Sequence, residues 1–94
     1  MKGYRTTPHF EKQFKRRISR VRNLAQDYKD AVETFLFDKS LVNDHGLDDK
    51  MSNSRAFSIN ENYRIIYHET NNYYIFTNIG THEQVYRRSN KKAN

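Results

Sequence analysis

The spacing of apolar residues changes once along this chain of 94 residues, and the change limits the folds that are open to it. Up to residue 40, apolar side chains recur every three or four positions, the repeat of one face of an α-helix, as in Phe10, Phe14, Ile18 and Val21. After residue 54, short segments dense in Tyr, Ile and Phe are separated by Asn-rich turns. Helices followed by strands predict an α+β fold, with the helices on one face of an antiparallel sheet.

We predict six elements in the order strand, two helices and three strands, over residues 4–7, 8–22, 27–40, 55–60, 63–68 and 73–78. Thr7-Pro8 is a typical helix start, because the hydroxyl caps the helix and proline fits its first position. The helices are separated by a tight break near Asn23, and a long loop starts at Leu41. The three strands form an antiparallel meander packed on the helices, and the other face of the sheet is expected to be open.

The chain is expected to form one domain over residues 1–88, followed by a flexible tail over residues 89–94. Hydrophobic residues make up 35% of the sequence, so the core must be thin, but seven Tyr and six Phe offset this because each ring buries a large apolar area. The absence of cysteine excludes disulfides and thiolate zinc sites. No apolar run is long enough for a membrane span or a signal peptide, so the cytoplasm is the expected location.

The net charge of +6 is unevenly distributed along the sequence. Residues 1–25 contain eight basic side chains and one acidic one, whereas residues 26–50 contain three basic and seven acidic ones. A basic block attracts polyanions, because neutralising phosphates releases counterions. The alternative is a solvated helix face paired with the acidic segment, and charge alone gives the two interpretations equal weight. The candidates for RNA binding in this block are Lys12, Lys15, Arg16 and Arg20.

Acid–base and electrostatic chemistry remains once the common motifs are excluded. The sequence has no phosphate-binding glycine motif, no nucleophile elbow and no His spacing typical of a zinc site, so neither metal nor cofactor is expected. Cleavage of RNA through its own 2′-hydroxyl needs a base, an acid for the leaving oxygen, and cations on the phosphate. The C-terminal half contains such a set, namely His45, Lys50, Arg55, Arg64, His82 and Tyr86.

Each of these residues also has a structural interpretation. A charged side chain on a half-buried strand needs a partner or a ligand, and Glu61 and Glu69 are candidate partners for Arg64. The other candidates could hydrogen-bond a turn, lie solvated at a strand edge or pack against neighbours, and they are His45, Arg55, Tyr63, His82 and Tyr86. Composition and spacing leave both interpretations open.

Three segments together resemble a known family: His-Gly-Leu at residues 45–47, RAFSINENYRIIY at residues 55–67, and IGTHEQVY at residues 79–86. They resemble the RelE/ParE superfamily of bacterial toxins, in its RelE/YafQ-like branch, and the resemblance extends over nearly the whole chain. It implies the toxin of a type II toxin-antitoxin pair, a metal-independent endoribonuclease that cuts translated mRNA on the ribosome. The implied partners are a cognate antitoxin, ribosomal RNA and mRNA, without a membrane, and the free toxin is expected to be monomeric.

The resemblance also implies roles for individual residues. Arg64 matches the strand arginine that contacts the scissile phosphate, His82 the histidine of the Gly-Thr-His segment, and Tyr86 the C-terminal aromatic residue. His45 matches the position of a candidate base, so His45 and His82 are the candidate acid and base in an order that is left open. Further RNA contacts are expected from Lys50, Arg55, Tyr63 and the basic residues of the first helix.

The sequence departs from the YafQ-like pattern in two places. Ser58 and Asn62 stand where YafQ-like toxins place an additional His and Asp, and Asp48-Asp49 make the loop before the second strand acidic rather than rich in Gly and Lys. Two alternatives therefore stay open, a ParE-like toxin that inhibits DNA gyrase without cutting RNA, and an inactive relative. A plain nucleic-acid-binding module is a further alternative, although such a module has no need of the Gly-Thr-His segment.

Overall fold

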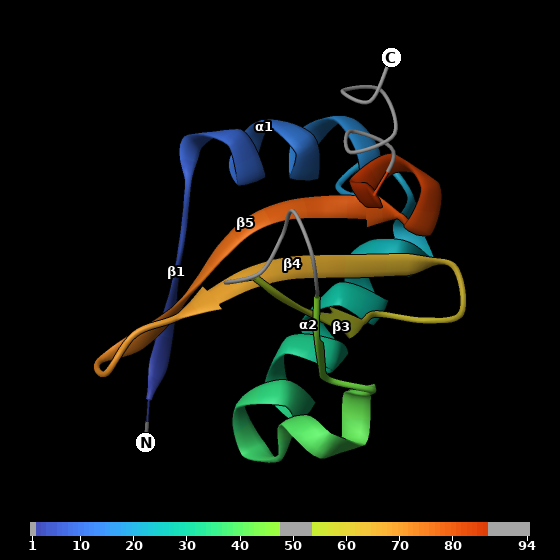
Figure 1. Cartoon of the computed structure of the whole chain (residues 1–94). Helices are drawn as coiled ribbons and strands as arrows, with labels where there is room; N and C mark the ends of the chain where they lie inside the picture. The colour runs from blue at the N-terminus through green and yellow to red at the C-terminus, as the bar shows by residue number, and fades with distance from the viewer. Residues whose placement is uncertain (1, 48–53, 87–94) are drawn as a thin grey trace.

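A computed structural model of the chain describes residues 2–47 and 54–86. Its elements are β1 (Gly3–Thr6), α1 (Pro8–Arg17), α2 (Arg22–Phe37), the 3-10 helix η1 (Lys39–Val42), β2 (His45–Gly46), β3 (Arg55–Ser58), β4 (Tyr63–Glu69) and β5 (Tyr73–Thr81) (Figure 1). Residues 82–86 form a further helical turn. The α+β class predicted from the sequence is confirmed, and the predicted tail over residues 89–94 lies outside the described residues.

The strands form one mixed sheet in the order β1-β5-β4-β3-β2. The predicted antiparallel meander is confirmed as β3, β4 and β5. The predicted N-terminal strand is confirmed as β1, which pairs in parallel with the first half of β5. The sequence did not predict β2, which pairs antiparallel with β3. Figure 1 shows β1 running beside β5, although the two strands lie at opposite ends of the chain. Such long-range or very short pairings leave little local signal in a sequence.

The two helices meet at a corner of residues 18–21 rather than near Asn23. Thr7 caps α1 as predicted, and its hydroxyl accepts a hydrogen bond from the Phe10 amide at 3.1 Å. α1 is therefore shorter than predicted and α2 begins earlier, and the Ile18 side chain is fully buried at the corner. Within the described residues, no helix has the length and apolar character needed to cross a membrane.

The predicted long loop after Leu41 contains two short elements instead, η1 and β2. Asp38 ends α2 and caps η1, since its carboxylate accepts a hydrogen bond from the Ser40 amide at 3.1 Å. Asn43 then takes a left-handed conformation with φ of 58°, a region that Asn tolerates better than most residues. The chain turns there and adds β2 to the edge of the sheet.

The main core lies between the helices and one face of the sheet, and aromatic rings dominate it. Phe35 of α2 stacks on Phe57 of β3, with their ring centroids 4.1 Å apart. Phe35 also meets Tyr67 and Tyr74 edge to face, at 4.9 Å and 4.7 Å between centroids. Large rings in these geometries bury much apolar surface from few residues, which is how a thin core stabilises the fold.

The opposite face of the sheet, which we call the outer face, is covered in part, and this corrects the predicted open face. Val85 of the helical turn 82–86 packs with Ala56 of β3 and Ile66 of β4 in a second buried cluster. Alternation along β4 places Arg64 and His68 on this face with Ile66, and both are half-buried. The outer face therefore combines a small apolar cluster with polar side chains around it.

A network of Asp44, Arg55 and Tyr67 attaches the chain around β2 to the sheet. Nη2 of Arg55 lies 2.6 Å from Oδ2 of Asp44, whose side chain is only 6% exposed. Nε of Arg55 donates to the Tyr67 hydroxyl at 3.2 Å, and that hydroxyl donates to Oδ1 of Asp44. Burial alone would raise the pKa of Asp44, but the hydrogen bonds from Arg55 and Tyr67 outweigh it, so this pKa lies below its usual value.

The network predicts an acid-sensitive contribution to stability. Because the pKa of folded Asp44 is depressed, its stabilising effect is present above the unfolded pKa of about 4 and is lost as the pH falls through the folded value. We expect Asp44→Asn to lower the free energy of unfolding at pH 7 by about 1 to 3 kcal/mol, since a buried, charge-assisted pair is lost. Urea unfolding at pH 7 and at low pH measures both effects, and the variant should lose less stability on acidification.

Glu69→Gln is the matched control, because Glu69 also pairs with cations, Lys2 and Lys39, but at the surface. Its cost at pH 7 should stay within about 1 kcal/mol. Equal losses for Asp44→Asn and Glu69→Gln would show that the network around Asp44 contributes no more than a surface ion pair.

Candidate functional site

Arg64, His82 and Tyr86 come together at one end of the outer face, and we call these three residues the site cluster. Arg64 lies directly opposite Gly80 in the pairing of β4 with β5. The helical turn 82–86 follows β5 at once, and within it the rings of His82 and Tyr86 meet edge to face, 4.4 Å between centroids. His82 is exposed and Tyr86 is half-buried, so the cluster presents an accessible imidazole beside a packed phenol.

The hydroxyl of Tyr86 is buried and has no hydrogen-bond partner among the described residues. Burial raises the pKa of this hydroxyl, and the positive charge of Arg64 opposes the shift, so the guanidinium lies close enough to act on it. Nη1 of Arg64 contacts the Glu61 carbonyl at 3.4 Å. Within residues 2–47 and 54–86, Arg64 forms no ion pair, and Glu69 pairs with lysines instead. The cation of the site cluster is therefore available to an anionic ligand.

A reciprocal capping box holds the turn that carries His82. The Thr81 hydroxyl accepts a hydrogen bond from the Gln84 amide at 3.1 Å, and Oε1 of Gln84 accepts one from the Thr81 amide at 2.8 Å. The His82 amide also donates to the Asn62 carbonyl at 3.1 Å, which ties the turn to the β3–β4 connection. The sequence prediction missed this helical turn, although Thr-x-x-Gln at residues 81–84 is its signature.

His45 lies farther along the same face. It pairs with Ala56 across β2 and β3, and paired residues of antiparallel strands share a face, so His45 lies on the side of the second cluster. Nδ1 of His45 is 2.9 Å from the Asn43 carbonyl oxygen. A carbonyl oxygen only accepts hydrogen bonds, so Nδ1 must carry the proton of this bond. In the neutral ring this leaves the lone pair on Nε2, as a general base requires.

Two of the predicted RNA-binding residues lie away from the site cluster. Arg55 is opposite Tyr67 and bonds to Asp44 and to the Tyr67 hydroxyl, so it serves the network described above. Tyr63 packs against the main core on the helix side of β4, one residue from Arg64 but on the other face. Lys50, with the acidic pair Asp48-Asp49, lies outside the described residues.

Ser58 and Asn62, two of the positions that depart from the YafQ-like pattern, lie beside the site cluster. Ser58 is opposite Arg64 in the β3–β4 pair and therefore shares its face. Asn62 provides the carbonyl that receives the His82 amide. Neither side chain is a strong acid or base at neutral pH, so neither supplies the proton-transfer group that a His or Asp would.

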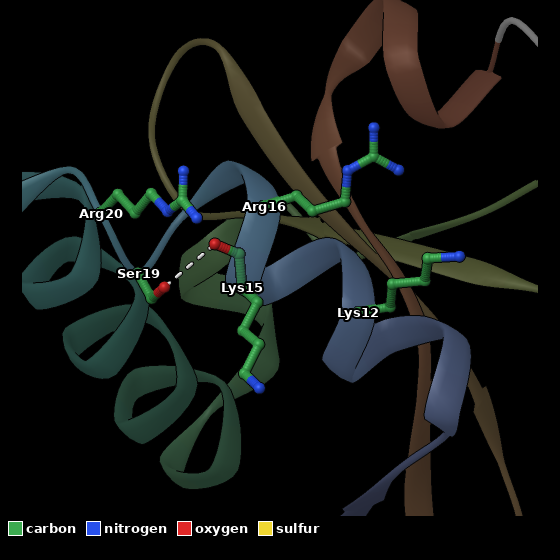
Figure 2. A pocket seen from close by; sticks show the side chains of 5 residues that line it. All are labelled: Lys12, Lys15, Arg16, Ser19 and Arg20. Atoms are coloured by element: carbon green, nitrogen blue, oxygen red, sulfur yellow. Dashed lines mark hydrogen bonds between the residues drawn. The ribbon is translucent and has the colours of Figure 1, made fainter.

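A basic surface lies on α1 and the corner that follows it. Lys12, Lys15, Arg16, Ser19 and Arg20 line an open hollow of about 550 Å³ (Figure 2). All five residues are exposed, and the Ser19 hydroxyl donates to the Lys15 carbonyl at 3.1 Å. The four predicted RNA-binding residues of this helix are thus brought together. Four cations around one shallow hollow suit a phosphate-rich chain better than a small apolar ligand.

The described residues contain no group of three or more His, Asp or Glu side chains that could hold a metal ion. The side chains placed on the outer face include imidazoles, a guanidinium and a phenol. These groups are the ones that a phosphodiester ligand would meet on the outer face.

Comparisons with solved structures agree on the fold. The chain is similar to YafQ from E. coli BL21(DE3), with a TM-score of 0.70 and 18% sequence identity over 92% of this chain and 99% of that one. It is similar to the E. coli DinJ-YafQ toxin-antitoxin complex, with a TM-score of 0.67 and 19% identity over 90% and 97% of the two chains. The chain is also similar to the YoeB dimer from Staphylococcus aureus, with a TM-score of 0.68 and 12% sequence identity over 86% of this chain and 97% of that one.

Sequence comparison identifies the family. No curated protein sequence matches the chain. The model of the YafQ family, described as the bacterial toxin of a type II toxin-antitoxin system, matches residues 2–87. Because this match spans nearly the whole sequence, the chain belongs to the YafQ family of bacterial toxins from type II toxin-antitoxin systems.

Proposed function

We propose that this toxin is a ribosome-dependent endoribonuclease that cleaves translated mRNA without a metal ion. The observation that carries the proposal is the site cluster, in which an exposed imidazole, an arginine without an ion pair among the described residues, and a tyrosine share one end of the outer face. The family match supports the proposal, because it makes the chain a toxin.

The proposed reaction uses the 2′-hydroxyl of the RNA as the nucleophile. A histidine takes the proton of this hydroxyl, its oxygen bonds to phosphorus, and the bond from phosphorus to the 5′-oxygen breaks. A second group acts as the acid and gives a proton to that leaving oxygen, so the products are a 2′,3′-cyclic phosphate and a 5′-hydroxyl. His45 and His82 are the base and the acid of this scheme, and the lone pair on Nε2 of neutral His45 favours His45 as the base.

Arg64 stabilises the extra negative charge that develops on the non-bridging phosphate oxygens in this scheme. Its guanidinium is planar and permanently charged, and it is already positioned on a strand, so little reorganisation is needed when charge develops. Tyr86 packs beside His82 and either stacks on a base or donates its hydroxyl proton. Because its pKa is raised, the hydroxyl carries its proton at neutral pH.

The basic surface of α1 docks the toxin on ribosomal RNA in this proposal. Lys12, Lys15, Arg16 and Arg20 face solvent together, so they attract phosphates without taking part in the chemistry. In this proposal α1 docks the toxin, whereas the residues that cleave RNA lie at the ends of β4 and β5. Lys50, Arg55 and Tyr63 remain predicted RNA contacts.

A cognate antitoxin is the proposed protein partner. E. coli YafQ, whose fold this chain shares, has been solved in complex with DinJ as a toxin-antitoxin complex. Because ribosomes and mRNA are the targets, the cytoplasm is the proposed site of action, and the free toxin is proposed to be a monomer.

Substitutions in the site cluster provide the first test. We expect Arg64→Ala and His82→Gln each to lower the cleavage rate about 100-fold or more, because each removes a group that acts in the transition state. Primer extension on an mRNA translated in a purified system measures this rate, and induced expression in growing cells measures growth arrest. Both variants should keep the unfolding free energy of the parent within about 1 kcal/mol.

His68→Gln is the matched control, because His68 lies on the same strand and the same face but at the other end of β4. Its activity should equal that of the parent. Inhibition of purified gyrase by the parent, without mRNA cleavage, would support a ParE-like toxin and contradict the proposal. A parent without either activity would be the inactive relative.

The basic surface provides the second test. We expect Lys15→Gln with Arg16→Gln to raise the KM for programmed ribosomes about 10-fold at moderate salt and to weaken its salt dependence, because fewer phosphates are neutralised. The maximal rate should change little, since neither side chain belongs to the site cluster. Cleavage rates over a range of ribosome and salt concentrations measure all three quantities.

Arg5→Gln with Lys29→Gln removes the same charge from exposed positions outside the hollow and serves as the control. An equal rise in KM for both double variants would mean that only net charge matters, and that the surface of α1 is no docking site.

A further inference from the structure

We propose that Arg17 is a positioning residue that fixes the junction between β5 and the turn carrying His82 and Tyr86. The proposal rests on the function proposed above, because the turn has a catalytic use only if the toxin cleaves RNA. Arg17 was counted with the basic block of the sequence, but its environment differs from that of its neighbours. Lys15 and Arg16 are exposed on α1, whereas Arg17 is half-buried.

The contact that sets Arg17 apart is a hydrogen bond to the sheet. Nη1 of Arg17 donates to the Ile79 carbonyl at 2.9 Å, between residues that are 62 positions apart in the sequence. β1 pairs with β5 only over Tyr73–Phe76, so in the described chain no strand covers the last part of β5 on that side. The arginine of α1 takes the place of a neighbouring strand and satisfies this carbonyl.

Gly80 shows how closely Arg17 and the turn are packed. A Cβ atom at Gly80 would lie 2.6 Å from Nη1 of Arg17 and 2.7 Å from Oε1 of Gln84. Both distances are too short for any side chain, so the two polar groups can hold these positions only over glycine. Oε1 of Gln84 is the same atom that accepts the Thr81 amide in the capping box.

The capping box and the arginine thus meet over one residue. Arg17 fixes the carbonyl before Gly80, Gln84 fixes the amide after it, and His82 follows one residue later. Gly80 is also the residue opposite Arg64. A displacement of Arg17 would therefore change the position of His82 relative to Arg64, and a misplacement of about 1 Å can cost a large factor in rate.

The first experiment measures how well the amides of the turn are protected from hydrogen exchange in the purified full-length toxin, without RNA. We expect Arg17→Met to speed amide hydrogen exchange of Thr81 and Gln84 about 10-fold or more, because the capping box loses its support. Arg17→Lys should restore part of the protection, since lysine can donate one hydrogen bond. Arg5→Met is the control, because Arg5 packs on the Tyr73 ring at 4.3 Å and lies on the other half of the sheet edge.

The second experiment separates positioning from docking by kinetics. For Arg17→Met we expect the maximal cleavage rate to fall about 10-fold while the KM for programmed ribosomes stays within about twofold. The opposite pattern, a raised KM with an unchanged maximal rate, would place Arg17 with the docking residues and overturn the proposal.

Gly80→Ala keeps the test decisive even if Arg17→Met does not fold. The added methyl group displaces the ends of two flexible side chains, so the fold should persist while protection of Thr81 and the cleavage rate fall as in Arg17→Met. In an Arg17→Ala background, Gly80→Ala should cost less than in the parent, since one of the two clashing groups is gone. Strict additivity of the two effects would contradict the proposal.

The two proposals fail in different ways. Unchanged exchange of Thr81 and Gln84 in Arg17→Met and Gly80→Ala would overturn the role of Arg17, whatever the activity. A parent that cleaves no RNA would overturn the proposed nuclease, while the exchange rates would still report whether Arg17 fixes the turn.

Discussion

The stacking of Phe35 on Phe57 is the contact on which the rest of the fold depends. Hydrophobic residues make up only 35% of the chain, so a few rings must bury most of the apolar surface. Phe35 joins α2 to three strands through its contacts with Phe57, Tyr67 and Phe76. Because one face of the sheet takes up the large rings, the other face needs only a small apolar cluster and can carry charged and titratable side chains.

Side chains of β4 alternate between the core and the outer face, and this alternation places Arg64 in the site cluster. Tyr63, Ile65 and Tyr67 face the helices, while Arg64 and Ile66 face outward, so a single strand stabilises the core and presents the arginine. The site cluster is completed by the helical turn after β5, which returns to the outer face and inserts Val85 beside Ile66. Alternate residues of β4 thus stabilise the core and form the candidate site.

Local patterns predicted the elements whose formation depends on local sequence. Thr7-Pro8 and the three central strands are examples, and Thr81-x-x-Gln84 could have been recognised in the same way. The helix corner at Ile18 and the edge strands depend on tertiary burial and distant pairing, which spacing does not encode. For the same reason the sequence did not predict the pairing of Arg55 with Asp44, since Asp44 lies in a segment predicted to be a loop. The placement of Arg64 beside the turn of His82 followed from the family resemblance and not from periodicity.

The parallel pairing of β1 with β5 has a consequence for synthesis. β1 and α1 are synthesised before β5, because the strand that receives them, and the Ile79 carbonyl that receives Arg17, are made more than sixty residues later. Contacts of such high sequence separation cannot form in a partial chain, and domains complete their folding only when all paired segments are available. A nascent chain that stops before β5 carries the basic helix without the junction that organises His82. The order of translation therefore separates the appearance of the basic helix from the appearance of the candidate site.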